Sequence, residues 1–251
     1  MKAFFSDLDN TLIYSHRTPI EDSKVLVERL NGKEQSYMTA FAFSFLQSAD
    51  WLSIIPVTTR SQEQYQRLVF PESFRIKYAL ICNGGKLLID GIEDYEWSVS
   101  TLNMVHDDLP DLEWLSIKLK DLCRSDVHCP ESYYHYVKTE SPEKICTILK
   151  SEYQKDNIII EHDHSKVYLF PRSVNKGEAV RRFLNRFETL ISIGAGDSSI
   201  DVPLLNVVNY PLAAISICSN IQNPDVKPLT GRIISDQICR ELEHLHKNDI
   251  N

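Results

Sequence analysis

Five short, almost wholly apolar runs, separated by segments with helical periodicity, limit the fold of this chain more than any other feature. The runs are residues 2–8, 53–58, 78–82, 189–193 and 213–218. Strands buried on both faces of a parallel sheet read as continuous apolar runs, and strands that alternate with helices form α/β sheets. We therefore expect an α/β protein with a largely parallel sheet.

Helical patterns and one hairpin signal fill the intervals between these runs. Ser61 and Gln64 have the spacing of a capping box, and apolar residues between 179 and 187 form one helical stripe. Helices are expected at residues 38–49, 61–68 and 179–187. Asn31-Gly32 lies between two strand-like segments and is a strong hairpin signal, so a β-flap should follow the first strand.

The middle of the chain has a different pattern and predicts an inserted domain. Paired strands are expected at 86–90 and 95–99, a helix over 112–122, a strand at 133–138, a helix from Ser141-Pro142, and a hairpin of 157–162 with 166–170. These elements suffice for a small α+β domain between the third and fourth runs. We therefore divide the chain into a core (residues 1–85 and 173–251) and an inserted cap (86–172).

Composition excludes some classes of partner. The formal net charge is -8 and no run is rich in Lys or Arg, which argues against nucleic acid. No apolar run approaches the ~20 residues of a membrane helix, so no membrane partner is expected. The six cysteines are scattered without a Cys-x-x-Cys pair, which is typical of reduced thiols in a cytoplasmic protein. The oligomeric state stays open.

Two carboxylates, Asp7 and Asp9, directly follow the first apolar run. In open parallel sheets, ligands bind beyond the carboxyl ends of the strands, so these acids should enter a site. Taken alone, the segment is equally a polar turn, because Asp9 and Asn10 are residue types that favour turns.

Other expected strand ends carry complementary side chains. They are Thr58-Thr59-Arg60, Asn83-Gly84-Gly85, and Gly196-Asp197 with Asp201, while Lys176 opens the helix before the fourth run. Each alone has a plain structural reading: a helix cap, a hinge, an N-cap or a surface lysine. A functional reading becomes the better one if Asp7, Asp9 and Asp197 converge in the fold, because two like charges ~4 Å apart repel by roughly 4 kcal/mol at an effective dielectric near 20. Mg²⁺, which prefers oxygen ligands, and Lys176 would offset that repulsion.

The motifs Asp7-x-Asp9-x-Thr11, Thr58, Lys176 and Gly196-Asp197 with Asp201 resemble, in order, those of the haloacid dehalogenase (HAD) superfamily of phosphohydrolases. The surrounding stretches are similar to its Cof-type and sucrose-phosphatase-like branch, in which a large α/β cap lies between motifs two and three. The resemblance implies a Rossmann-like, three-layer core with a mostly parallel sheet and an inserted α+β cap. Thr59, where the branch usually has glycine, and Asp201 after Ile200 depart from the pattern.

The resemblance also implies a function and a set of roles. The protein would be a Mg²⁺-dependent phosphatase that hydrolyses a small phosphorylated metabolite, such as a sugar phosphate, through an aspartyl-phosphate on Asp7. Asp9 would act as general acid and base with a raised pKa. The metal would bind Asp7, the Asp9 backbone carbonyl and Asp197, with Asp201 orienting this set. Residues expected to bind phosphate or substrate are Thr11, Thr58, Thr59, Arg60, Asn83 and Lys176.

Three other readings stay open. A phosphomutase uses the same core but returns the phosphoryl group to a sugar hydroxyl. A receiver domain also has an aspartate, a threonine or serine and a lysine around Mg²⁺, but its acceptor follows the third strand. A protein that binds a phosphorylated ligand without turnover would keep the same residues.

Overall fold

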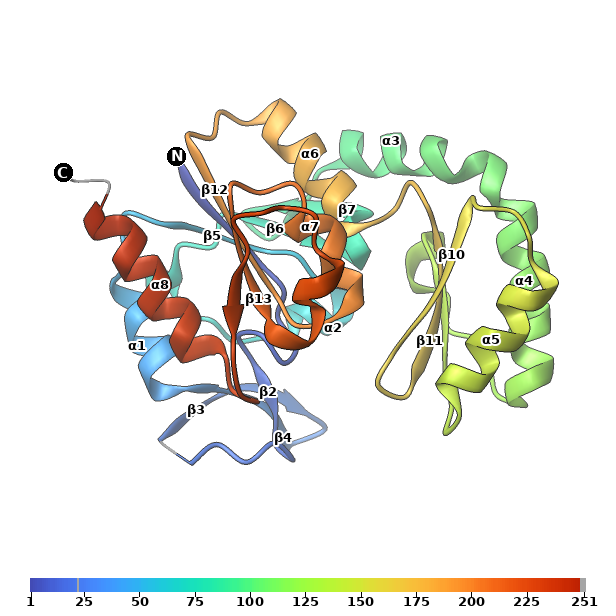
Figure 1. Ribbon diagram of the computed structural model, residues 1–251, viewed down its shortest axis with the longest axis horizontal. Helices are drawn as coiled ribbons and strands as arrows, with labels where there is room; N and C mark the ends of the chain where they lie inside the picture. The colour runs from blue at the N-terminus through green and yellow to red at the C-terminus, as the bar shows by residue number, and fades with distance from the viewer. Residues whose placement is uncertain (22, 249–251) are drawn as a thin grey trace.

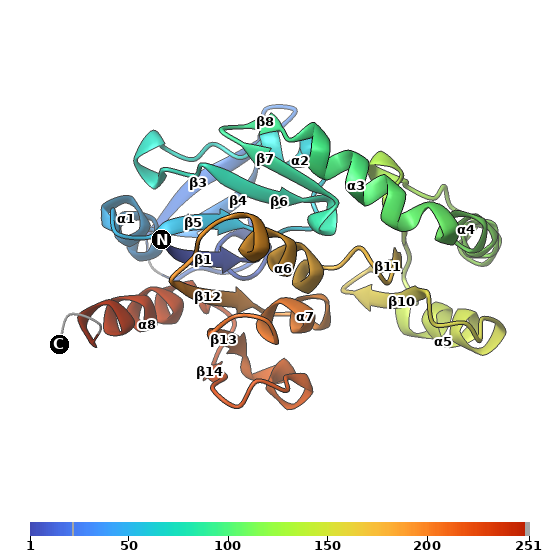
Figure 2. The ribbon, with the colours of Figure 1, turned by 90° about the horizontal axis from the view of Figure 1, so that it is seen from above.

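The computed structural model describes residues 1–21 and 23–248 and has a parallel sheet at its centre (Figure 1). The strands are β1 (Lys2–Ser6), β5 (Ser53–Pro56), β12 (Ile191–Gly196), β13 (Tyr210–Ala214) and β14 (Lys227–Leu229). Their order is β14-β13-β12-β1-β5, and every neighbouring pair is parallel (Figure 2). The predicted α/β fold is confirmed. The apolar run at 213–218 was misassigned, because only its first two residues belong to β13 and the rest form the 3-10 helix η6 (Ile215–Asn220).

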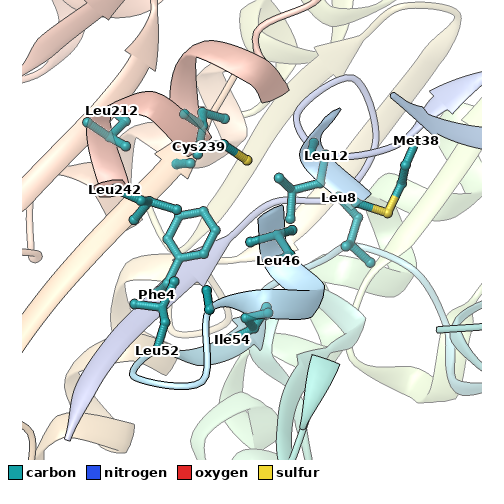
Figure 3. Packing of buried hydrophobic residues seen from close by; sticks show 14 of the residues in the cluster. Phe4, Leu8, Leu12, Met38, Leu46, Leu52, Ile54, Leu212, Cys239 and Leu242 are labelled. Carbon is teal, nitrogen blue, oxygen red and sulfur yellow. The ribbon is translucent and has the colours of Figure 1, made fainter. Parts of the chain in front are cut away.

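Helices cover both faces of this sheet and make three layers. Side chains alternate along a strand, so Phe4 and Phe5 point to opposite faces, and each lies in a separate apolar cluster. Phe4 packs with α1 (Ala40–Ser48) and α8 (Ser235–Asn248), as Figure 3 shows. Phe5 packs with α6 (Lys176–Arg186) and α7 (Val202–Leu205). The sheet is therefore buried on both sides, as its continuous apolar strands require.

Two small antiparallel sheets border the central one. The flap joins β2 (Tyr14–Ser15), β4 (Lys33–Thr39) and β3 (Lys24–Leu30), and Asn31 and Gly32 take positive φ at its hairpin turn, as predicted. The second sheet joins β6 (Tyr78–Ile81), β7 (Lys86–Ile89) and β8 (Ile92–Glu93). The predicted domain boundary after Gly85 falls inside this second sheet.

The strand predicted at 95–99 is wrong, because these residues begin the helix α3 (Tyr95–Val105). The Asp94 side chain caps it by accepting a hydrogen bond from the Trp97 backbone N–H at 2.9 Å. Trp97, Thr101 and Val105, four residues apart, are buried along one side of the helix. Figure 1 shows α3 leading from the core to the elements that follow.

The elements that follow α3 form a separate antiparallel sheet with helices on one face. The sheet has the order β10-β11-β9, from β9 (His135–Lys138), β10 (Ile158–Asp163) and β11 (Lys166–Pro171). Val137, Val167 and Leu169 pack in one cluster with α4 (Leu109–Cys123) and α5 (Pro142–Glu152). The intervening aromatic residues Tyr136, Tyr168 and Phe170 lie in another cluster, with Ile81 of β6 and Leu88 of β7. The aromatic face of this sheet is thus turned toward the core.

The remaining elements are short. They are α2 (Gln62–Gln66), which has the predicted capping box at Ser61, and the 3-10 helices η1 (Glu72–Phe74), η2 (Cys82–Gly84), η3 (His106–Asp108), η4 (Pro130–Ser132) and η5 (Ser199–Asp201). Within the described residues, no helix has both the length and the apolar character needed to cross a membrane.

Candidate active site

Asp7 and Asp197 leave the sheet side by side. Asp7 directly follows β1 and Asp197 directly follows β12, and these strands are parallel neighbours in which Ser6 pairs with Ala195. The Asp7 backbone N–H donates to the Ala195 carbonyl at 3.0 Å. Parallel pairing therefore brings together acids that are 190 positions apart in the chain.

Asp201 joins these two acids, and the three form a buried cluster. One carboxylate oxygen of each residue lies within 4.8 Å of those of the other two. Burial, with the charges of Asp201 and Asp9, raises the pKa of Asp7 to about 7 despite the nearby Lys176. Burial and the charges of Asp7 and Asp201 raise the pKa of Asp197 to about 9. The nearby Lys176 thus does not balance the negative charge of the three acids, which is the environment of a cation site.

Lys176 supplies one positive charge to the cluster from the first turn of α6. Its Nζ donates to Asp7 Oδ1 at 2.5 Å and to Asp201 Oδ1 at 2.6 Å, and the residue is 2% exposed. The Asn175 side chain caps the helix by accepting from the Glu178 N–H at 2.9 Å. Burial opposes the charge of Lys176, but the two carboxylates outweigh it and raise the pKa above its ordinary range. Lys176 is therefore held as a cation between two acids.

Asp201 orients the loop that carries Asp197. Its second oxygen, Oδ2, accepts from the backbone N–H groups of Asp197 and Ser198, both at 3.0 Å, and from the Ser198 hydroxyl at 3.2 Å. A Cβ on Gly196 would lie 2.3 Å from the Cβ of Asp201, so glycine permits this approach. Thr11 Oγ1 donates to Asp197 Oδ1 at 3.1 Å and fixes that carboxylate from the other side.

The carboxylate of Asp9 is held by Arg60, and the expectation that its pKa is raised is wrong for this arrangement. Arg60 donates from Nε to Oδ2 at 2.9 Å and from Nη2 to Oδ1 at 2.8 Å. Partial desolvation favours the neutral acid, although half of the side chain is exposed, but the hydrogen bonds and charge of Arg60 outweigh it and lower the pKa of Asp9. Asp9 is therefore an ionised carboxylate in this arrangement.

Arg60 is itself held by Glu28 of the flap, a residue that sequence reasoning missed. Glu28 is 4% exposed and accepts from Arg60 Nη1 at 3.0 Å and Nη2 at 3.1 Å. It also accepts from Arg67 Nε at 3.2 Å and from the Ser36 hydroxyl. Register shifts interrupt the ladder of β3 with β4 on both sides of Glu28. That irregularity turns the carboxylate inward, and no local pattern in the sequence signals it.

The other predicted phosphate or substrate residues lie at the ends of β5 and β6. Thr58 is buried, and its Oγ1 accepts from the Arg60 backbone N–H at 3.1 Å. The Thr59 carbonyl accepts from the Tyr134 hydroxyl. Asn83 Nδ2 donates to the Val174 carbonyl at 2.9 Å, which ties the end of β6 to the segment before Lys176. Their contact with a substrate stays a prediction.

A cleft of about 600 Å³ extends from Asp9 and is lined by both the core and the antiparallel sheet of β9–β11. The core contributes Asp9, Thr59 and Arg60, and the opposite wall contributes Lys138 and Lys166 among others. Sequence reasoning missed these two lysines, because the register of the β9–β11 sheet decides which side chains face the core. The cleft is large enough for a small metabolite.

Comparison with known proteins identifies the fold. No model of a protein family matches the chain, and no curated protein matches it. Among solved structures, the sucrose-phosphatase of Synechocystis, in complex with sucrose and phosphate, is 13% identical over 97% of both chains with a TM-score of 0.64. A phosphatase of the HAD enzyme superfamily from Bacteroides thetaiotaomicron is 12% identical over 97% of this chain and 94% of its own, with a TM-score of 0.53. A HAD subclass IIB sugar phosphatase is 12% identical over 98% and 99%, with a TM-score of 0.55. The chain therefore has the fold of the HAD superfamily phosphatases, as the order of its motifs predicted.

Proposed function

We propose that this protein is a Mg²⁺-dependent phosphatase that hydrolyses a phosphoric monoester of a small metabolite through an aspartyl-phosphate on Asp7. The observation that carries the proposal is the position of Asp7. It lies at the carboxyl edge of the parallel sheet, next to Asp197, and accepts a hydrogen bond from the buried Lys176. A carboxylate so placed can attack phosphorus while a fixed cation stabilises the phosphoryl oxygens.

The residues present fit a divalent cation. Three carboxylates supply oxygen atoms within 4.8 Å of one another, and the raised pKa values of Asp7 and Asp197 mark a deficit of positive charge. Asp7, Asp197 and the backbone carbonyl of Asp9 would hold Mg²⁺, and Asp201, occupied by Lys176 and two backbone N–H groups, would orient them. When bound, Mg²⁺ would neutralise charge on the phosphoryl group.

In the first step, Asp7 forms a bond to phosphorus as the bond to the leaving oxygen breaks. Asp9 gives that oxygen a proton. In the second step a water molecule forms a bond to phosphorus as the bond from Asp7 to phosphorus breaks, Asp9 takes a proton from the water, and inorganic phosphate leaves. The ion pair with Arg60 favours the second role, because it stabilises the ionised carboxylate. The acid role requires a complex in which Arg60 has turned from Asp9 toward the substrate. Lys176 and Thr58 would hold phosphoryl oxygens, and Thr11, through Asp197, would keep the cluster in place.

We also propose a division of labour between two parts of the chain. Residues 1–85 and 173–251 would carry the chemistry, and residues 86–172 would form a cap that selects the substrate. We propose one adjustment, that the selecting part begins beyond α3. It is supported by the pairing of β7 and β8 with β6 and by the packing of Trp97 of α3 in the cluster that contains Phe5. Because the similar structures include a sucrose-phosphatase and a sugar phosphatase, a sugar phosphate or a related ester is the substrate class we propose.

The proposal is tested by measuring release of inorganic phosphate from p-nitrophenyl phosphate and a panel of phosphorylated sugars, with Mg²⁺ and with a chelator. We expect turnover with Mg²⁺, a loss of at least about 10³-fold on chelation, and a similar loss in Asp7→Asn, which keeps the shape but removes the nucleophile. Asp50→Asn, an exposed residue remote from the site, is the matched control. An Asp7→Asn protein with most of the wild-type rate would exclude the proposed nucleophile.

A further inference from the structure

The cleft beside Asp9 has the opposite charge to the chain as a whole. The formal net charge of the protein is -8. Among the described residues, the lining of the cleft nevertheless includes six basic side chains and three acidic ones. The basic residues are Arg17, Arg60, Arg67, Lys138, Lys166 and Arg232, and the acidic residues are Asp9, Glu28 and Asp163. A local excess of positive charge within an acidic protein indicates an anionic ligand.

Ion pairs on the core side leave four basic side chains of the cleft without a carboxylate partner among the described residues. Arg60 holds Asp9 and Glu28, and Arg67 pairs with Glu28. No carboxylate of the described residues lies within 4.0 Å of the charged groups of the other four, Arg17, Lys138, Lys166 and Arg232. The third acid of the lining is Asp163, whose Oδ1 lies 2.9 Å from Nδ1 of His164.

Lys138 and Lys166 are directly opposite each other on β9 and β11. Like charges in such cross-strand pairs destabilise a sheet. The repulsion between Lys138 and Lys166 therefore lowers the stability of this sheet, and a bound anion would remove it. Lys166 Nζ lies 5.3 Å from the ring centre of Tyr136 and 5.8 Å from that of Tyr168. These rings hold the ammonium group at the cleft without neutralising it. Burial and the charge of Lys138 lower the pKa of Lys166, while the charge of Asp9 acts in the other direction.

The two arginines reach the cleft from the opposite wall. Arg17 follows β2 of the flap, and Arg232 lies in the segment before α8, so both belong to the core. Arg232 and His164, which lies at the tip of the β10–β11 hairpin, both line the cleft, so the two walls face each other there. Positive charge is therefore present on both sides of the space in which a substrate would lie beyond its reacting phosphate.

We propose that Lys138 and Lys166, together with Arg17 and Arg232, bind a second anionic group of the substrate. The preferred substrates are then small phosphomonoesters that carry a further phosphate or carboxylate, rather than esters of neutral sugars. This inference rests on the proposed phosphatase function and specifies its substrate class. It distinguishes the chain from a sugar phosphatase whose cap contacts only hydroxyl groups.

The test compares kcat/KM for matched pairs of esters in the presence of Mg²⁺. One pair is fructose 1,6-bisphosphate and fructose 6-phosphate, which tests a phosphate. The other is 6-phosphogluconate and glucose 6-phosphate, which tests a carboxylate. We expect wild-type protein to prefer the anionic member of at least one pair by about tenfold or more. The double variant Lys138→Gln/Lys166→Gln should reduce that ratio to within about threefold of unity.

Two further double variants separate charge from folding. Lys138→Arg/Lys166→Arg keeps both charges and should retain the preference. Lys144→Gln/Lys150→Gln removes two exposed lysines of α5, away from the cleft, and should also retain it. A wild-type ratio near unity in both pairs, with phosphate released from all four esters, would overturn the second-anion site and leave the phosphatase function standing.

Failure of the proposed function gives a different result. If wild-type protein releases no phosphate from any ester, calorimetry with fructose 1,6-bisphosphate and fructose 6-phosphate decides the inference alone. Tighter binding of the bisphosphate, weakened about tenfold in Lys138→Gln/Lys166→Gln, supports the site. Equal affinities of the two ligands, or no change in the variant, overturn it.

Discussion

Replacing Lys176 by methionine should destabilise the protein strongly, because it leaves two buried acids without their cation. Methionine has a similar volume and length, so the change removes the charge with little change in packing. Lys176 donates two short hydrogen bonds, at 2.5 Å to Asp7 and at 2.6 Å to Asp201, and the Asp201 side chain is 0% exposed. Breaking a buried ion pair by removing one partner costs about 3–5 kcal/mol. For a chain of this size that corresponds to a fall in Tm of roughly 6–20 °C.

The loss of folding stability in Lys176→Met should be larger at high pH than at low pH. Burial already raises the pKa of Asp7 to about 7, so this acid takes up a proton in the folded protein well above its ordinary range. A group with a raised folded pKa contributes stability that is present at low pH and lost as the pH rises through that pKa. Without Lys176 the pKa of Asp7 rises further. The difference between wild type and variant should therefore be largest near pH 8 and smaller near pH 5.5.

The assay is urea denaturation at both pH values in the presence of a chelator, so that no metal replaces the lysine. Lys150→Met, an exposed lysine of α5, is the control and should change the free energy of unfolding by less than about 0.5 kcal/mol. Asp7→Asn added to Lys176→Met should restore part of the loss. A loss below about 1 kcal/mol at pH 8, or the same loss at both pH values, would refute the reasoning.

Two further predictions concern supports of the site, and a third concerns the buried His135 of β9. Gly196→Ala places a Cβ 2.3 Å from that of Asp201 and should cost about 1–3 kcal/mol in urea denaturation; an unchanged midpoint would show that the loop has room. Glu28→Gln should cost about 1–3 kcal/mol at neutral pH. Burial disfavours the charge of Glu28, but Arg60 outweighs it and lowers the pKa. The stability that the charged Glu28 adds is present above its ordinary pKa of 4.5 and falls as the pH drops below that value. The difference between the two proteins should therefore shrink at acidic pH, and a constant difference would contradict this. Burial lowers the pKa of His135 below 6.5; its ring should titrate below that value by NMR, and the folded protein should lose stability as the pH falls. A ring that titrates at or above 6.5 would contradict its burial as the cause.

Strands β1, β5 and β12 of the central sheet were predictable because they are buried and read as continuous apolar runs. The run at 78–82 was placed in the wrong sheet, because β6 pairs with β7 in an antiparallel sheet, and β14, which is largely exposed, has no apolar run to predict it. The proximity of Asp7 and Asp197 was predictable for a related reason: parallel strands bring their carboxyl ends to one edge of the sheet. A strand was wrongly predicted at residues 95–99, because apolar and polar side chains alternate in Tyr-Glu-Trp-Ser-Val as they do in a half-buried strand. The hydrogen bond from the Trp97 N–H to the Asp94 side chain and the burial of Trp97 stabilise a helix instead. The burial of Trp97 depends on the rest of the fold.

The electrostatic surroundings of the site were much less predictable than its acids. Asp9 was expected to have a raised pKa, but Arg60 lowers it, and Arg60 is fixed by Glu28 from the flap. That contact depends on an irregularity in the β3–β4 ladder. The side of the sheet on which Lys166 lies depends on strand register, and a shift of one residue would reverse it. Single-sequence patterns contain neither kind of information.

The most direct test of the account is to trap the phosphoryl group on the protein. Wild-type protein is mixed with a ³²P-labelled ester and Mg²⁺, quenched in acid within milliseconds, and digested for mass spectrometry. The account predicts one labelled peptide, containing Asp7, whose label is released by hydroxylamine as expected for an acyl phosphate. Phosphate release with no label on Asp7 at any time, or label on another residue, would contradict it.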